Sequence, residues 1–321
     1  MGICIGKIKL GKPLPEPEPV PEEIISKLSN SSENSDKFRF ANGKRYHNVK
    51  NAVYFVPNDS EECDRLHLQH AMERYIWQGN FFSPVENLLN QEGTMVLDSG
   101  TGAGSWILEM AVDYPKSKFI GIDISPVQPE ENIPPNAKFT QANLLERLPF
   151  DDNTFDFIFQ RFLCLGIPAD KWQSVVNELV RVLKPGGYLE LAENDIHYDV
   201  MGPASKILID GLSLLLHERG LNATVCYKIQ SYLEENNQLY NIHCEQKKDL
   251  NGLDTNRVFK LLAEDYTSGL VNIKPTLINT INASSDEYDR LVKVMEKETI
   301  DLESFNPHIR VYAQKRKKKS S

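Results

Sequence analysis

The sequence lacks several features that would place the protein in a specialised class. No apolar run approaches the roughly 20 residues that span a bilayer, and the best candidate, residues 212–216, ends at His217. The five cysteines never form a C-x-x-C pair, so neither a disulfide framework nor a structural zinc cluster is expected. A cationic excess is also missing, since the net charge is −9, and no nucleic-acid partner is expected. We expect an intracellular globular protein with free thiols.

The two ends of the chain differ from its body. Residues 1–44 contain five prolines between 13 and 21, followed by a polar stretch without periodicity, and we expect a disordered tail. Residues 316–321 are predicted to be a basic tail, which leaves a domain at 45–315. The body is acidic, whereas both ends carry clustered lysines.

The location of the protein is left open by these ends. Gly2 and Cys4 partly fit an acylation signal, although Gly6 stands where Ser or Thr is usual. Acylation would give a peripheral membrane anchor, and the alternative is an unmodified tail. The KRKKK run at 315–319 would serve as a nuclear address, a lipid-attracting patch or a solubilising tail. We expect a cytoplasmic protein, with the nucleus and the membrane periphery as alternatives.

The body alternates short apolar strands with amphipathic helices, a pattern that favours an α/β fold with a parallel sheet covered on both faces. The strands are expected at 94–98, 118–124, 137–143, 155–162, 188–193, 240–247 and 310–314. The helices are expected at 60–77, 84–90, 105–113, 169–183, 204–219, 227–236, 255–281 and 285–300. Helix 60–77 precedes the first strand. The helices after residue 195 are expected to be insertions that follow the fifth strand.

A glycine-rich turn joins the first strand to the next helix. Gly100, Gly102 and Gly104 follow Asp98, and such turns let a ligand approach the backbone. A nucleoside triphosphate site would need a Lys after the last glycine, where Ser105 stands. A dinucleotide site would need G-x-G-x-x-G, so a nicotinamide oxidoreductase is disfavoured. Asp98 would repel a pyrophosphate and attract an ammonium group. A ligand with an ammonium and a ribose, such as S-adenosylmethionine, fits better.

Two further strand ends support a nucleoside ligand. Asp123, followed by Ile124, ends the second strand where a carboxylate can accept both ribose hydroxyls. Asn143 and Leu144 end the third strand, and the Asn amide or the Leu144 N–H could meet the adenine edge. Three such signals at consecutive strand ends predict a cofactor site.

These segments resemble the class I S-adenosylmethionine-dependent methyltransferases. The resemblance is carried by VLDSGTGAG, GIDIS, QANLLERLPFDDNTFDFIF and RVLKPGGYLELAE, and it covers about 45–315. The leader YFVPNDSEECDRLHLQHAMERYIWQGNFFSPV, the DISPVQP turn and FQRF resemble a fungal group that includes regulators of secondary metabolism. The departures are Ser99, where Val or Ile is frequent, and Asn194, where proline is common.

The resemblance implies a Rossmann-like seven-stranded sheet, mostly parallel with the last strand reversed, and a helical lid at the N-terminus. It implies S-adenosyl-L-methionine as the cofactor, across the carboxyl ends of the first strands. Tyr54 and Gln69 on the lid become cofactor contacts, and Gln160 would face the methyl group. The helices after 195 would build the acceptor pocket.

Methyl transfer requires a base only if the acceptor must lose a proton. The weak candidates are His67, His70, Glu193 and His197. For each of them a solvated or packed role is the simpler interpretation, and the catalytic residue stays unassigned. Cys63, His67 and His70 share a helix face that could suggest zinc, but a fourth ligand has no source, and no metal is expected.

We therefore expect a methyltransferase that moves a methyl group from S-adenosylmethionine by in-line displacement. The acceptor is unidentified, and a small molecule is favoured over a protein because no N-P-P-Y-like run follows the fourth strand. The alternative is a non-catalytic scaffold or regulator with the same fold that acts through protein partners.

Overall fold

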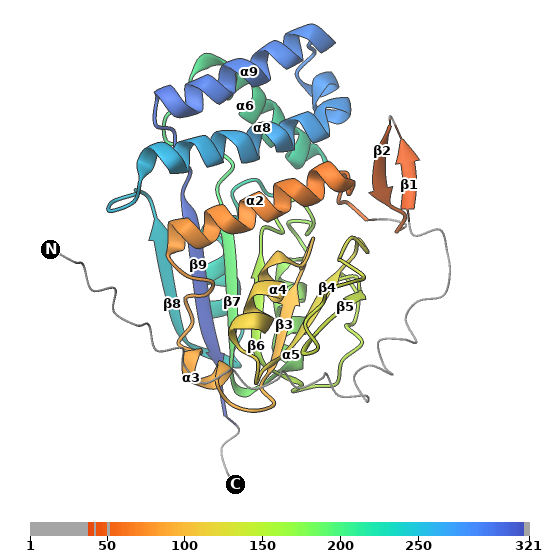
Figure 1. The fold of residues 1–321 in the computed structure, drawn as a ribbon, viewed down its shortest axis with the longest axis vertical. Coiled ribbons are helices and arrows are strands. Elements are labelled where there is room, and N and C mark those ends of the chain that lie inside the picture. The colour runs from red at the N-terminus through yellow and green to blue at the C-terminus, as the bar shows by residue number, and fades with distance from the viewer. Residues whose placement is uncertain (1–37, 42, 50–51, 318–321) are drawn as a thin grey trace, which may run out of the picture.

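The computed structural model describes residues 38–41, 43–49 and 52–317, and a seven-stranded sheet lies at its centre (Figure 1). The strands run in the order β5-β4-β3-β6-β7-β9-β8. Their bounds are β3 (Met95–Ser99), β4 (Lys118–Asp123), β5 (Ala137–Gln141), β6 (Phe155–Arg161), β7 (Leu183–Asn194), β8 (Leu239–Lys247) and β9 (His308–Lys315). The first five strands are parallel, and β9 is antiparallel to both β7 and β8. The prediction of a mostly parallel sheet with a reversed last strand is confirmed.

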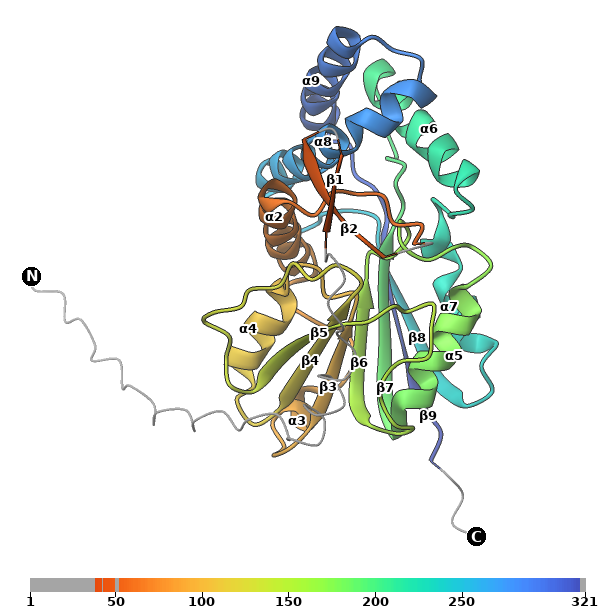
Figure 2. The same ribbon diagram turned by 90° about the vertical axis from the view of Figure 1, so that its right-hand side faces the viewer.

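The sheet is covered on both faces because its central strands are apolar on both sides. All five residues of β3 are buried. One face packs against α3 (Glu86–Leu89) and α4 (Ser105–Asp113), where Trp106 stacks on Phe159 with ring centroids 4.4 Å apart. The other face packs against α5 (Trp172–Val182), η1 (Val225–Tyr227) and α7 (Ile229–Glu234) (Figure 2). The predicted three-layer arrangement is confirmed.

Four helices form a cap at one end of the sheet (Figure 1). They are α2 (Ser60–Trp77), α6 (Pro203–Glu218), α8 (Thr255–Thr280) and α9 (Ser285–Asp301). Each long helix begins where a side chain or proline favours it: the Asp59 carboxylate accepts from the Glu62 N–H, Asp254 and Ser284 cap α8 and α9, and Pro203 begins α6. Two apolar clusters hold the cap together. One lies among α6, α8 and α9, and the other lies between α2 and α8.

A two-stranded hairpin differs from the expectation. Strands β1 (Phe38–Ala41) and β2 (Lys44–His47) pair antiparallel, whereas the sequence interpretation assigned residues 1–44 to a tail and began order near Tyr46. The Asn42-Gly43 pair, a common two-residue hairpin turn, was the available signal. Residues 1–37, with Gly2 and Cys4, and residues 318–321 of the basic tail lie outside the described residues. No described helix has the length and apolar character needed to cross a bilayer.

Candidate functional site

The glycine turn after β3 has the backbone that its sequence predicts. Gly100, Gly102 and Gly104 have φ of 77°, 55° and 85°, which side-chain-bearing residues rarely adopt. A Cβ on Gly100 would lie 2.6 Å from Leu163 Cδ2, and one on Gly104 would lie 2.7 Å from the Phe139 ring. Gly104 therefore permits packing of helix against sheet, while Gly100 and Gly102 line an open cavity.

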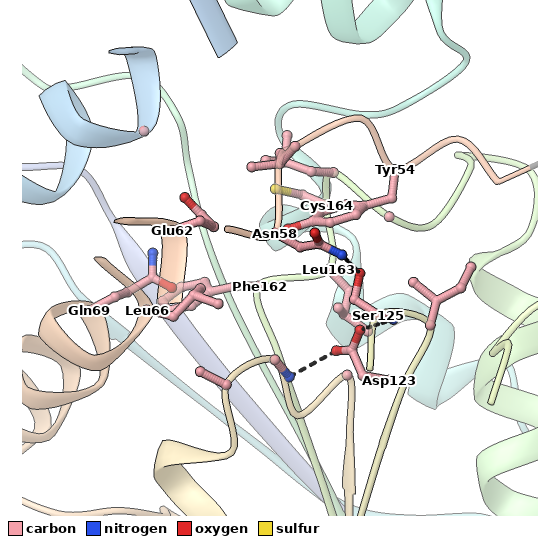
Figure 3. Close-up of a pocket in the computed structure, with 18 of the residues that line it drawn as sticks. Tyr54, Asn58, Glu62, Leu66, Gln69, Asp123, Ser125, Phe162, Leu163 and Cys164 are labelled. Atoms are coloured by element: carbon pink, nitrogen blue, oxygen red, sulfur yellow. Dashed lines mark hydrogen bonds between the residues drawn. The ribbon is translucent and has the colours of Figure 1, made fainter. Parts of the chain in front are cut away.

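Asp123 at the end of β4 is tied to this turn. Its carboxylate accepts from the Gly102 N–H and the Ser125 N–H, each at 2.8 Å (Figure 3). The Gln128 amide donates to the carbonyls of Gly102 and Ser125 at 2.7 and 2.9 Å. Burial raises the pKa of Asp123 although these N–H groups favour its ionised form. The carboxylate is thus fixed beside the turn, with lone pairs left for two further donors.

The cavity lies between the glycine turn, the leader of α2 and the inner face of α8, and has a volume of about 250 Å³. Eight residues expected to contact a cofactor line it: Tyr54, Gln69, Gly100, Gly102, Asp123, Ile124, Asn143 and Leu144. The strand order brings them together at the carboxyl ends of β3, β4 and β5, with Tyr54 and Gln69 supplied by the leader and α2 (Figure 3).

Three other expected residues lie outside the lining of this cavity. Asp98 is buried, and its carboxylate accepts from the Thr101 hydroxyl at 2.7 Å. Burial raises the pKa of Asp98 to about 6, against the opposing effects of Thr101 and Arg161. Gln160 is fully buried and accepts from the Ser99 hydroxyl at 3.0 Å, because strand alternation turns it beneath the sheet edge. Gly104 serves packing, as described above.

Asn143 lines the cavity, but its side chain makes local bonds. The amide donates to Glu146 Oε1 at 3.0 Å, and its oxygen accepts from the Leu145 N–H at 3.0 Å. The side chain of Asn143 is thus already engaged, and of the two expected contacts to an adenine edge the backbone N–H of Leu144 stays a prediction.

The corner after β6 was not recognised from the sequence. Residues 161–167 all line the cavity, and Phe162 has a φ of 55°, an unusual value for an aromatic residue. Glu193 holds this corner: its carboxylate accepts from the Leu163 N–H at 2.7 Å and from the Cys164 N–H at 3.3 Å. Burial outweighs these donors and raises the pKa of Glu193 to about 8. The only sequence signal was FQRF itself, which was interpreted through Gln160.

A charged network joins α2 to α8 above the cavity. Arg65 contacts Glu62 at 2.6 Å and Asp265 at 2.7 Å, and the Gln69 amide donates to Asp265 at 3.2 Å. Asn272 donates to Glu62 at 2.8 Å. Both carboxylates are buried, so the network satisfies charges that would otherwise be costly.

The four weak catalytic candidates lie outside the lining of the cavity. His67 Nδ1 is 2.7 Å from the Ser105 hydroxyl, and His197 Nδ1 is 2.7 Å from Asp195 Oδ1. His70 has a partner at each nitrogen, Glu109 at 2.7 Å and Arg161 at 3.0 Å. Glu193 supports the corner. Each group has a structural partner.

Comparison with known families connects this geometry to a class of proteins. Residues 96–187, which run from β3 through the glycine turn to the start of β7, match a family model described as a methyltransferase domain.

Residues 96–187 are therefore similar to a methyltransferase domain, and they lie within the seven-stranded sheet. The resemblance to methyltransferases that the motifs carry is confirmed over these residues.

Curated fungal proteins that are similar to part of this chain carry related names. The methyltransferase pytC of Aspergillus terreus is 33% identical over 53% of this chain and 50% of its own length. The N-methyltransferase verN of Clonostachys rogersoniana is 30% identical over 56% of this chain and 61% of its own length. The secondary metabolism regulator laeA of Coprinopsis cinerea is 31% identical over 49% of this chain and 40% of its own length. The chain spans less than two thirds of the length of each of these relatives. Their fungal sources agree with the fungal group that the leader resembles.

The site of the methyltransferase domain has the chemistry that the cofactor needs. Gly100 and Gly102 expose their backbone to the cavity, and Asp123 offers a carboxylate beside them. Ala142 and Leu144 supply an apolar wall for a base, next to the Leu144 N–H. These groups match a ribose, an adenine and the backbone-facing part of an amino acid.

Proposed function

We propose that this protein transfers a methyl group from S-adenosylmethionine to an acceptor bound under the helical cap. The observation that carries the proposal is the Asp123 carboxylate, which is fixed 2.8 Å from the Gly102 N–H at the mouth of the glycine turn. The ribose hydroxyls would donate to Asp123, and the adenine would lie between Ile124 and Leu144. When bound, the cofactor supplies an electrophilic methyl group.

The residues of the chain would contribute alignment and exclusion of water. In-line displacement at a methyl group gains much of its rate from correct positioning of the two reactants. Tyr54 and Gln69 cover the cavity from the leader and α2, and the corner at 162–164 closes its inner side. Because the four candidate bases lie outside the lining, we expect transfer to a nucleophile that needs no histidine base.

The acceptor part of the cavity is apolar. It is lined by Val53, Val56, Cys164, Leu165, Ile167, Ile196, Leu212, Leu270 and Ile273. Burial of such surface favours a ligand with an apolar skeleton. We propose a small apolar molecule with one nucleophilic atom, in preference to a protein side chain.

The location proposed is the cytoplasm. Cys63, Cys164, Cys226 and Cys244 are free thiols in the described part of the chain, which fits a reducing compartment. Fractionation of cells that express the full chain, beside Gly2→Ala and Cys4→Ser variants, would test this against membrane anchoring.

Calorimetric titration tests the cofactor directly. We expect micromolar binding of S-adenosylmethionine, a loss of at least tenfold in Asp123→Ala, and no binding of NAD. Asp210→Asn is the matched control, because this carboxylate pairs with Lys206 at 2.9 Å on the surface of α6. Failure of the folded wild-type protein to bind S-adenosylmethionine would refute the proposal.

An acceptor screen with radiolabelled methyl groups follows if binding is found. Transfer to a small molecule would support the enzymatic function. Binding of the cofactor without turnover on any small molecule or protein fraction would favour the scaffold interpretation.

A further inference from the structure

Arg161 is a cation inside the cavity without a carboxylate partner among the described residues. It ends β6, lines the cavity, and makes one hydrogen bond through its side chain, from Nη2 to His70 Nδ1 at 3.0 Å. Phe159 lies under the guanidinium, 5.9 Å from its carbon to the ring centroid. The group is attracted by Asp98, Glu73 and Glu109, but no described carboxylate forms an ion pair with it. A guanidinium has five N–H groups, so most of its donors remain for a ligand.

His70 fixes the orientation of this guanidinium. Because arginine can only donate, His70 Nδ1 must accept, and the ring proton must lie on Nε2, which donates to Glu109 Oε2 at 2.7 Å. Burial and the positive charge of Arg161 lower the pKa of His70 to about 4, so the ring stays neutral at physiological pH. Glu109 is held in turn by Arg74 at 2.8 Å. The chain of contacts from α4 through α2 to β6 therefore orients Arg161.

The strand order indicates which part of a ligand would reach Arg161. Leu144 follows β5, Asp123 ends β4, Gly100 follows β3 and Arg161 ends β6, and these strands are neighbours in that order. A nucleoside held over β5 and β4 would extend its substituent past the glycine turn toward β6. In S-adenosylmethionine that substituent is an amino acid, whose carboxylate matches the fork of N–H donors of a guanidinium.

We propose that Arg161 binds the carboxylate of the methionyl group of the cofactor, and that His70 is a positioning residue for Arg161. This inference rests on the proposed function. It gives His70 a role other than proton transfer, since both of its nitrogens are occupied.

The test compares two ligands that differ in the carboxylate alone. Decarboxylated S-adenosylmethionine keeps the sulfonium, the ammonium and the adenosine. Calorimetry on the full chain should give tighter binding of S-adenosylmethionine by about tenfold or more. Arg161→Gln should weaken S-adenosylmethionine and leave the decarboxylated ligand within threefold, so that the preference disappears. Arg161→Lys should retain part of it.

The positioning role of His70 has its own readout. His70→Leu should reduce the preference by a smaller factor than Arg161→Gln, because the guanidinium remains but is no longer oriented. An unchanged preference in His70→Leu would refute this role. Arg316→Gln is the control for loss of one positive charge. Arg316 follows β9, which ends beside Tyr188 of β7 and so at the end of the sheet away from Arg161, and it donates to the Asn237 carbonyl.

The outcomes separate the two proposals. If the wild-type protein binds neither ligand, the cofactor proposal fails. If it binds both equally, or if Arg161→Gln keeps the preference, the cofactor proposal stands and the role of Arg161 is refuted. The wild-type comparison needs no variant, so the inference is testable even if Arg161→Gln does not fold. A variant that keeps the preference but loses affinity for a carboxylic acid acceptor would assign Arg161 to the acceptor instead.

Discussion

The two sides of the cavity are built in different ways. On the glycine-turn side, which comprises residues 98–104 and 123–128, the contacts are short in sequence: Asp123 is 21 residues from Gly102, and Gln128 is 26. On the cap side, which comprises α2, α8 and residues 161–167, Arg65 contacts Asp265 200 residues away, and Glu62 contacts Asn272 210 residues away. The first side depends on backbone conformation, and the second depends on buried charge pairs between distant helices.

The largest effect is expected on the cap side, from Arg65→Met. The substitution leaves Glu62 and Asp265 buried without their cation, and we expect the free energy of unfolding to fall by about 3 kcal/mol. Chemical denaturation measures this. The matched control is Lys206→Met, whose exposed pair with Asp210 should contribute less than about 0.5 kcal/mol. Equal effects in the two variants would show that the cap does not depend on the network.

The glycine-turn side should respond to backbone strain. Gly100→Ala combines a left-handed φ with a clash against Leu163, and we expect a loss of roughly 2 kcal/mol together with weaker cofactor binding. Gly93→Ala is the matched control, because Gly93 has a φ of 76° and nothing within 4 Å of the added Cβ. It should cost about 1 kcal/mol through φ alone. Thermal unfolding of both variants measures these losses. If the two variants lower the melting temperature equally, the contact between an added Cβ at Gly100 and Leu163 does not contribute to the loss of stability.

The corner at 161–167, on the cap side, should make the stability of the protein depend on pH. Because the pKa of Glu193 is about 8 in the folded state and near 4.5 in the unfolded state, the folded protein binds more protons between these values. Its stability therefore falls as pH rises through that window, and Glu193→Gln should remove about 2 kcal/mol of this fall. Urea denaturation at pH 5 and pH 8 measures the difference.

Glu178 provides a control of opposite sign. Burial opposes its ionised form, but the hydrogen bonds from Arg181 and the Leu148 N–H outweigh burial and lower the pKa. Its stabilising contribution is present above the unfolded pKa and is lost as pH falls, so Glu178→Gln should destabilise more at pH 8 than at pH 3. Parallel pH profiles of the two variants would contradict this assignment.

The smallest effect concerns the hairpin. Lys44 Nζ lies 3.3 Å from Asp59 and 2.5 Å from Glu61, and it donates to Asn272 at 3.1 Å, which links β2 to α2 and α8. Lys44→Gln should change the free energy of unfolding by less than 1 kcal/mol while accelerating hydrogen exchange of the β2 amides. Lys297→Gln, with a distant exposed partner, should leave that exchange unchanged. Equal exchange rates in both variants would show that the hairpin is independent of the cap.

The difference between the two sides explains what the sequence could predict. The glycine spacing, Asp123 and the strand periodicity are local, and they located the sheet, the turn and eight cavity residues. Strict strand alternation would have predicted that the Gln160 side chain points away from the cavity and that the Arg161 side chain points into it. The interpretation of FQRF assigned the ligand contact to Gln160 and not to Arg161. The pairing of Arg65 with Asp265 depends on how α8 returns over α2, which no local pattern encodes. The hairpin was not predicted because the polar stretch before it led us to assign residues 1–44 to a tail, although Asn42-Gly43 is typical of a hairpin turn.

The position of β9 has a consequence for synthesis of the chain. Among the described strands β8 pairs with β9 alone, and β9 separates β8 from β7. While a ribosome produces residues 248–307, β7 and β8 therefore each have an unpaired hydrogen-bonding edge. Such edges favour strand pairing between nascent chains. The cap helices α8 and α9 are made during this interval. Early termination within it would leave the cap helices without β9, the strand that follows them.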